Sequence, residues 1–167
     1  MQGKQLWLHP IFGSDTNLLL GAKVAECSNQ HFARAENITS PLRPRFDPTL
    51  FGQQGKVMDS WESGRHNVIE FDSAVFELRQ PVSHIKSIIV STEYHNGNHG
   101  EFVGIDVRNK GSQEWTVMLP KNQLRGHSMH VFGVQCPIDD VTHVRVRNYP
   151  DGGITRVGLF ETRNFHT

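Results

Sequence analysis

Two carboxylates, two cations and one large aromatic side chain stand close together between Gly55 and Arg65: Asp59, Glu62, Lys56, Arg65 and Trp61. Carboxylates can move protons, and cations can hold an anionic ligand. Such a set is typical of the floor of a polar pocket, with the aromatic ring as its apolar wall. The alternative is an exposed turn whose charges pair loosely, at about 0–1 kcal/mol for each pair. Composition alone favours neither interpretation.

A second polar stretch lies near the end of the chain. Tyr149-Pro150-Asp151-Gly152-Gly153 predicts a tight turn between two strands. It follows Arg145 and Arg147, which alternate with valines, so we expect the acidic turn and these cations to share one end of a β-structure. Loops at the end of a sandwich are where such folds usually bind ligands.

Histidines offer a third kind of chemistry, because the chain contains 10 of them. His95 and His99 flank Gly97, and His127 and His130 stand three residues apart. No cysteine pair and no His-Glu-x-x-His motif accompanies them, so hydrogen-bonded or solvated loop histidines are the favoured interpretation. We assign no metal ligand and no certain cofactor; an activating or adventitious divalent ion is the alternative.

Charge and composition narrow the classes of partner. The 167 residues contain 17 basic and 17 acidic side chains, which argues against nucleic acid or an anionic membrane as the main partner. Two cysteines are too few for a disulfide scaffold. The first residues do not form a secretion signal, and Leu18-Leu19-Leu20 is too short to cross a bilayer. We therefore expect a cytoplasmic protein.

The hydrophobic pattern has a period of two over most of the chain, which predicts strands. One short helix is expected over Asn29–Asn37, and a long irregular loop over Ser40–Gly55, which contains three prolines. The segment 1–20 is expected as an extended lead-in to a domain over 21–167. Short strands with frequent turns and almost no helix indicate an all-β sandwich or jelly roll. The expected strands are Ala22–Ser28, Ala74–Leu78, Ile85–Thr92, Phe102–Val107, Trp115–Leu119, Met129–Val134, Thr142–Val146 and Ile154–Phe160.

Two motifs resemble the allantoicase repeat. They read Gly55-Lys56-x-Met58-Asp59-x-Trp61-Glu62-x-x-Arg65 and Thr142-His143-Val144-Arg145-x-x-x-Tyr149-Pro150-Asp151-Gly152-Gly153-Ile154-x-Arg156. Shorter matches support them in the right order: Phe32-Ala33-x-x-Glu36-Asn37, Gly97-Asn98, Leu119-Pro120-Lys121-x-x-Leu124 and Ser128-x-His130-x-Phe132. The resemblance runs from about Gly21 to Phe160. It implies a jelly-roll β-sandwich, like that of galactose-binding domains, and hydrolysis of allantoate to ureidoglycolate and urea in purine breakdown.

A ureide substrate assigns expected roles to the polar residues. Arg65 suits the substrate carboxylate because its fork is bidentate, with Arg145 or Arg156 as further cations and Lys56 and Trp61 beside it. Glu36, Asn37 and Asn98 are expected at the ureido groups, and Asp151 at the turn. Breaking the carbon–nitrogen bond needs an acid and a base, for which Glu62, Asp59 and His130 are candidates. A structural salt bridge or turn cap remains the alternative for each.

Family enzymes usually carry two such repeats in tandem, whereas this chain has room for one, which resembles the first. The resemblance therefore implies that two or more chains associate into a homo-oligomer. A non-catalytic sandwich module, which binds a small ligand or a protein, stays open beside the hydrolase.

Overall fold

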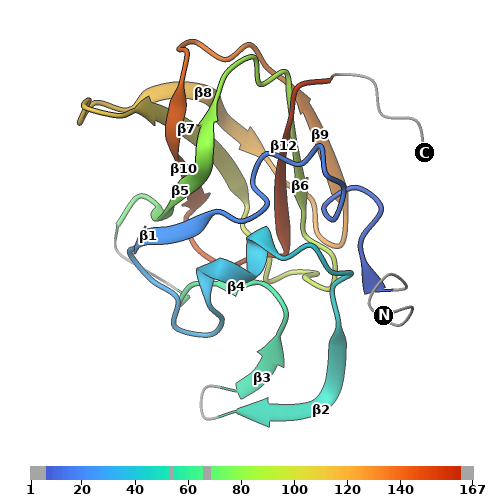
Figure 1. Ribbon diagram of the computed structural model, residues 1–167. Coiled ribbons are helices and arrows are strands. Elements are labelled where there is room, and N and C mark those ends of the chain that lie inside the picture. The colour runs from blue at the N-terminus through green and yellow to red at the C-terminus, as the bar shows by residue number, and fades with distance from the viewer. Residues whose placement is uncertain (1–6, 53–54, 66–68, 163–167) are drawn as a thin grey trace.

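Two antiparallel sheets form a β-sandwich in the computed structural model, which describes residues 7–52, 55–65 and 69–162 (Figure 1). The larger sheet has the strand order β1-β5-β10-β7-β8 and the smaller one β12-β6-β9. The five strands of the larger sheet are β1 (Lys23–Cys27), β5 (Asp72–Val82), β7 (Phe102–Asn109), β8 (Thr116–Gln123) and β10 (Val141–Tyr149). Those of the smaller sheet are β6 (Ser87–Ser91), β9 (Met129–Gly133) and β12 (Arg156–Phe160).

Strand β10 shows why the larger sheet forms. Val144 and Val146 are fully buried, while Arg145 between them is partly exposed, as the two-residue period of a strand requires. Val144 lies opposite Phe76 of β5 on one side and Val107 of β7 on the other. These side chains belong to the core that the two sheets enclose. Full burial of one such side chain stabilises the folded state by roughly 1.5–3 kcal/mol.

Strand β6 is buried on both faces, and the amino-terminal segment explains this. Ile88 and Val90 join the main core, whereas Ile89 points to the other face and packs with Phe12 and Phe160. The segment that carries Phe12 folds into turns against β12, to which it is tied by a hydrogen bond from Leu18 N to Leu159 O at 2.8 Å. Residues ahead of β1 therefore complete a second, smaller core.

The all-β sandwich is confirmed, and the expected strands are present with shifted ends, but two local predictions are wrong. The expected irregular loop contains a hairpin of β2 (Phe46–Gly52) and β3 (Gly55–Met58), which extends from one end of the sandwich (Figure 1). The expected helix is replaced by a 3₁₀ turn, η1 (Ala35–Thr39). Asn29 explains the shift, because its Oδ1 accepts hydrogen bonds from His31 N and Gly64 N and holds the chain in a turn.

The same end of the sandwich holds a two-stranded ladder of β4 (Trp61–Glu62) and β11 (Gly153–Ile154). It joins the two sequence motifs: Glu62 lies opposite Gly153, and Trp61 opposite Ile154. The expected last strand is consequently divided into β11 and β12, with Thr155 between them. No helix in the described part of the chain is long and apolar enough to span a membrane.

Candidate functional site

Trp61 and Glu62 point in opposite directions because neighbouring residues of a strand alternate. Trp61 is fully buried in the main core, and its Nε1 donates a hydrogen bond to Asn29 O at 2.8 Å. The expectation that this ring forms a pocket wall is therefore wrong, since the ring is a core side chain. Glu62 is held by backbone hydrogen bonds to Ala33 on one side and by the β11 pairing on the other.

The carboxyl group of Glu62 occupies a largely buried position, with 8% of the residue exposed. Burial raises the pKa of Glu62, because the charged form loses its water. The Arg65 charge and a hydrogen bond from Asn98 lower this pKa and offset part of the burial effect. Glu62 therefore keeps a proton to a higher pH than an exposed glutamate, which suits a general acid.

A chain of hydrogen bonds leads away from Glu62 through Asn98 to His95 and Ser60. His95 Nδ1 lies 3.3 Å from Asn98 Oδ1, and His95 Nε2 lies 2.7 Å from Ser60 Oγ. Burial lowers the pKa of His95 to about 4, so the ring is neutral at pH 7. A neutral ring that donates from Nδ1 to the Asn98 oxygen accepts at Nε2 from the Ser60 hydroxyl. The Asn98 amide nitrogen is then left to donate to Glu62.

Arg65 and Asp151 bring the two motifs together beside this chain. Arg65 Nε lies 3.0 Å from Asp151 Oδ1; the side chain of Asp151 is 6% exposed and that of Arg65 is 38% exposed. Ser63 fixes the turn, since its Oγ accepts a hydrogen bond from Gly152 N at 3.1 Å. Gly152 has φ +115°, and a Cβ there would come within 2.8 Å of Asn98 O, so the turn requires glycine.

Asp59 and Arg156 form a separate, structural pair. Arg156 is fully buried, and its Nη2 lies 2.9 Å from Asp59 Oδ2. The remaining guanidinium N–H groups donate to backbone carbonyls of Leu42, Asn37, Asp59 and Thr155. The amide of Asn37 in turn donates to Ser60 O at 2.9 Å. The structure thus uses Asp59, Arg156 and Asn37 to fasten η1 and the Ser60 turn to β12.

Two other expected residues, His130 and Arg145, have partners away from Glu62. His130 accepts from Arg125 N at Nε2 (2.8 Å), and its Nδ1 lies 3.0 Å from Val90 O. Both ring nitrogens are therefore occupied by backbone groups, and burial lowers the pKa of His130. Arg145 binds Asp106 through Nε and Nη2, at 2.8 and 2.7 Å. Asp106 is the acidic partner of both Arg145 and Arg147, whereas the turn residue Asp151 pairs with Arg65.

Glu36 and Lys56 complete the set of expected site residues. Glu36 is exposed and pairs with Arg34 at 3.2 Å. Lys56 belongs to β3, and its side chain lies outside the described residues. The structure therefore brings together Glu62, Arg65, Asn98 and Asp151 from the expected list. It adds Ser60 and Ser63, which the sequence analysis did not consider, and His95, which it considered only as a loop histidine.

The described residues contain no group of three or more histidine, cysteine, aspartate or glutamate side chains that could hold a metal ion. Three of the four paired histidines are hydrogen-bonded, whereas the Nδ1 atom of His99 is buried without a partner among the described residues. His127 Nδ1 accepts from Tyr94 N at 2.9 Å, and His95 and His130 have the partners given above. A hydrogen-bonded role for these loop histidines agrees with the favoured interpretation of the sequence.

Comparisons with known proteins agree with the two motifs. Residues 16–164 match the family model of the allantoicase repeat. The allantoicase of Saccharomyces cerevisiae is 33% identical over 152 residues, which cover 84% of this chain and 44% of that protein. The allantoicase of Neurospora crassa is 34% identical, with 84% and 43% covered. The chain thus spans less than half the length of the relatives it matches.

Solved structures show the same relationship. The crystal structure of the Saccharomyces cerevisiae allantoicase matches with a TM-score of 0.73 and 29% identity, over 87% of this chain and 46% of that one. Another allantoicase structure gives 0.75 and 28%, with 87% and 47% covered. An F5/8 type C domain from Bacteroides fragilis shares the fold alone, at 0.58 and 20%, with 86% and 93% covered. The chain belongs to the allantoicase family and contains a single allantoicase repeat.

Proposed function

We propose that this chain is a hydrolase that releases urea from allantoate and leaves ureidoglycolate. The observation that carries the proposal is Glu62, a buried carboxyl group with a raised pKa, positioned by Asn98 next to the cation Arg65. Membership of the allantoicase family supports the choice of substrate. A carboxyl group with a raised pKa beside a partly exposed arginine fits a substrate that carries both a carboxylate and a leaving group that needs a proton.

Arg65 is proposed to bind the substrate carboxylate. Asp151 engages its Nε, and its terminal nitrogens have no hydrogen-bond partner among the described residues. The pairing with Asp151 fixes the plane of the guanidinium group, so two parallel N–H groups can meet a carboxylate with little further ordering. The carbon that carries both ureido groups would then lie toward Glu62.

Glu62 is proposed to act first as an acid and then as a base. Its proton passes to the nitrogen of the departing ureido group as the carbon–nitrogen bond breaks, and urea leaves. The resulting carboxylate then takes a proton from a water molecule, whose oxygen bonds to the same carbon. The second transfer restores the acid, so one water is consumed for each urea released. Asn98 holds the carboxyl group in place for both steps.

Urea release from allantoate tests the proposal, with Glu62→Gln and Arg65→Gln compared with the unchanged protein. Glu62→Gln is expected to lower turnover by roughly 10²–10⁴-fold with little change in KM. Arg65→Gln is expected to raise KM more than it lowers turnover, because it removes a charge-assisted contact to the substrate carboxylate. The exposed Glu36→Gln is the matched control and should leave both constants unchanged. Full activity in the Glu62 variant would remove the proposed acid.

A second candidate function is a module that binds a small ligand without turnover. It is favoured by the fold that the chain shares with F5/8 type C domains, since the match to the allantoicases covers less than half of their length. Calorimetric titration with allantoate beside the urea assay separates the two. Heat of binding without urea release supports the module, whereas urea release supports the hydrolase.

A further inference from the structure

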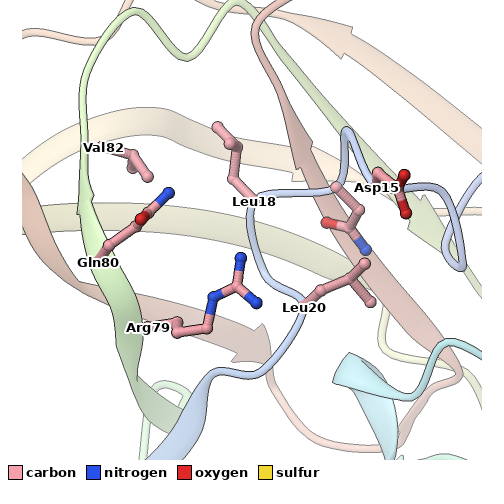
Figure 2. Close-up of a pocket in the computed structure, with 7 residues that line it drawn as sticks. Asp15, Leu18, Leu20, Arg79, Gln80 and Val82 are labelled. Carbon is pink, nitrogen blue, oxygen red and sulfur yellow. The ribbon is translucent and has the colours of Figure 1, made fainter.

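A pocket of about 210 Å³ lies between the amino-terminal turns and strand β5, and it shares no lining residue with the Glu62 site. Its polar wall comes from Arg79 and Gln80, and Asp15 stands on the opposite side (Figure 2). Leu18 and Leu20 supply apolar surface between them, and Val82 adds apolar surface on β5 beside Gln80. Its size is below the roughly 300–1,000 Å³ of pockets for drug-sized ligands, so it suits a smaller molecule.

An irregularity in β5 explains why two successive residues line one pocket. Glu77 is the last residue of β5 paired in register with β1 and β10, and the next paired residue is Val82. The register with β10 shifts between Val141 and His143 at this point. Residues in a regular strand alternate between faces, but a bulge interrupts that alternation. Arg79 and Gln80 can therefore both face the pocket.

The absence of a side chain at Gly21 leaves room for the side chain of Arg79. Gly21 has φ +76°, and a Cβ there would lie 3.3 Å from Arg79 Cδ. The arginine stem thus crosses the bare backbone of Gly21, and Figure 2 shows its guanidinium group extending toward the space beside Leu18 and Leu20. The side chains of Arg79, Gln80 and Asp15 have no hydrogen-bond or ion-pair partner within the described ranges. Three polar groups are consequently free to meet a ligand.

The opposite wall is rigid. Asn17 is buried, its Nδ2 donates to Phe12 O, and its Oδ1 accepts from Leu19 N and Leu159 N. These bonds fix the turn that presents Asp15 and Leu18 and connect it to β12. A fixed wall limits the ordering cost of binding.

We propose that this pocket binds a short linear ω-amino carboxylate. The carboxylate lies against the guanidinium group of Arg79, within reach of the Gln80 amide. The ammonium group at the other end pairs with Asp15. The aliphatic stem rests on Leu18, Leu20 and Val82. Two opposite charges at the two ends of the pocket, with apolar surface between them, select a molecule with the same order of groups. This site is independent of the proposed hydrolysis at Glu62.

Titration of the full ¹⁵N-labelled chain with 4-aminobutanoate tests the proposal by NMR. We expect saturable shifts at the amides of Leu18, Leu20 and Val82, with a Kd on the order of millimolar, because both ion pairs are partly exposed. Butanoate and butylammonium, which each lack one charge, should bind more weakly. Higher ionic strength should also weaken the binding of 4-aminobutanoate, because salt screens both ion pairs.

Two variants locate the site. Arg79→Gln and Asp15→Asn should each raise the Kd for 4-aminobutanoate about fivefold. Both variants should fold normally, because the two side chains are exposed. Arg34→Gln, which removes an exposed arginine elsewhere, should leave the Kd unchanged, and so should Glu62→Gln. Absence of saturable shifts well above millimolar concentration would overturn the proposal. Equal binding by the Arg79 and Asp15 variants would overturn it too. Neither outcome depends on urea release.

Discussion

The imidazole ring of His95 lies against the backbone of Gly153, so close that a Cβ at position 153 would come within 3.0 Å of its ring atoms. Gly153 is also the residue that pairs with Glu62 across the β4–β11 ladder. The same glycine therefore fixes Glu62 through its backbone and His95 through the absence of a side chain. Both ends of the Glu62–Asn98–His95 chain of hydrogen bonds depend on this position.

Gly153→Ala is expected to destabilise the protein by about 1–3 kcal/mol, because His95 is buried and cannot move aside for a methyl group. Thermal unfolding would measure the loss as a lower Tm. Gly133→Ala is the matched control, since nothing lies within 4 Å of a Cβ at that position. The Tm of this variant should stay close to that of the unchanged protein. Equal Tm values for the two variants would contradict the close contact at His95.

The pH dependence of urea release should report the protonation of Glu62. Activity is expected to fall as pH rises through its raised pKa, because the acid form is lost. Asn98→Leu removes a hydrogen bond that lowers this pKa, so the falling limb should move to higher pH. Arg65→Gln should move it in the same direction by removing a favourable charge. A limb that stays in place in both variants would assign the titration to another group.

Asp59 is expected to affect stability rather than the chemical step. Asp59→Ala leaves the fully buried Arg156 without its carboxylate and should cost about 3 kcal/mol, as for other broken buried pairs. Glu36→Ala breaks the exposed pair with Arg34 and should cost less than about 1 kcal/mol. Denaturant unfolding compares the two. If folded Asp59→Ala at low temperature releases no urea, Asp59 has a catalytic role after all.

The strands could be predicted because their signal is local. Val144 and Val146 alternate with arginines, and this period alone places them on the inner face of β10. The hairpin of β2 and β3 was missed because prolines in Ser40–Gly55 indicate a loop, although Pro48 occupies the edge of a two-stranded sheet. The local pattern also could not show whether Trp61 faces the core or the pocket, since β4 is only two residues long.

The site depends on contacts between distant parts of the chain, which a single sequence does not show. Asp59 and Arg156 are 97 positions apart, and His95 and Ser60 are 35 apart. Both motifs could be found in the sequence, but the ion pairs between them could not: Arg65 pairs with Asp151, and Asp59 pairs with Arg156. No sequence signal marked His95 as the neighbour of Asn98, beyond its place before the Asn96-Gly97 turn.

Association of two or more chains remains a prediction from the length comparison. The match covers 44% of the Saccharomyces cerevisiae allantoicase, so that relative contains a further region of comparable size. We expect a homodimer or higher oligomer of closed symmetry, since identical surfaces on two copies can cover each other. Light scattering at several protein concentrations measures the mass. A monomeric mass throughout would contradict this expectation.

Stability should fall in mildly acidic solution because His95 is buried in its neutral form. Its pKa is about 4 in the folded chain and near 6.5 when unfolded, so the unfolded chain binds more protons between these values. The contribution of His95 is therefore fully present above pH 6.5 and is lost as pH falls toward 4. His9, whose pKa is also lowered to about 4 by burial, should act in the same direction.

Glu62 opposes this trend, since its raised pKa lets the folded chain bind the extra proton above the usual value of 4.5. Its contribution is present at low pH and is lost as pH rises through the folded pKa. Chemical denaturation at a series of pH values should separate the two groups. His95→Asn is expected to flatten the loss of unfolding free energy between pH 6.5 and 4, while Glu62→Gln should make it steeper. An unchanged slope in His95→Asn would show that His95 is not neutral in the folded chain.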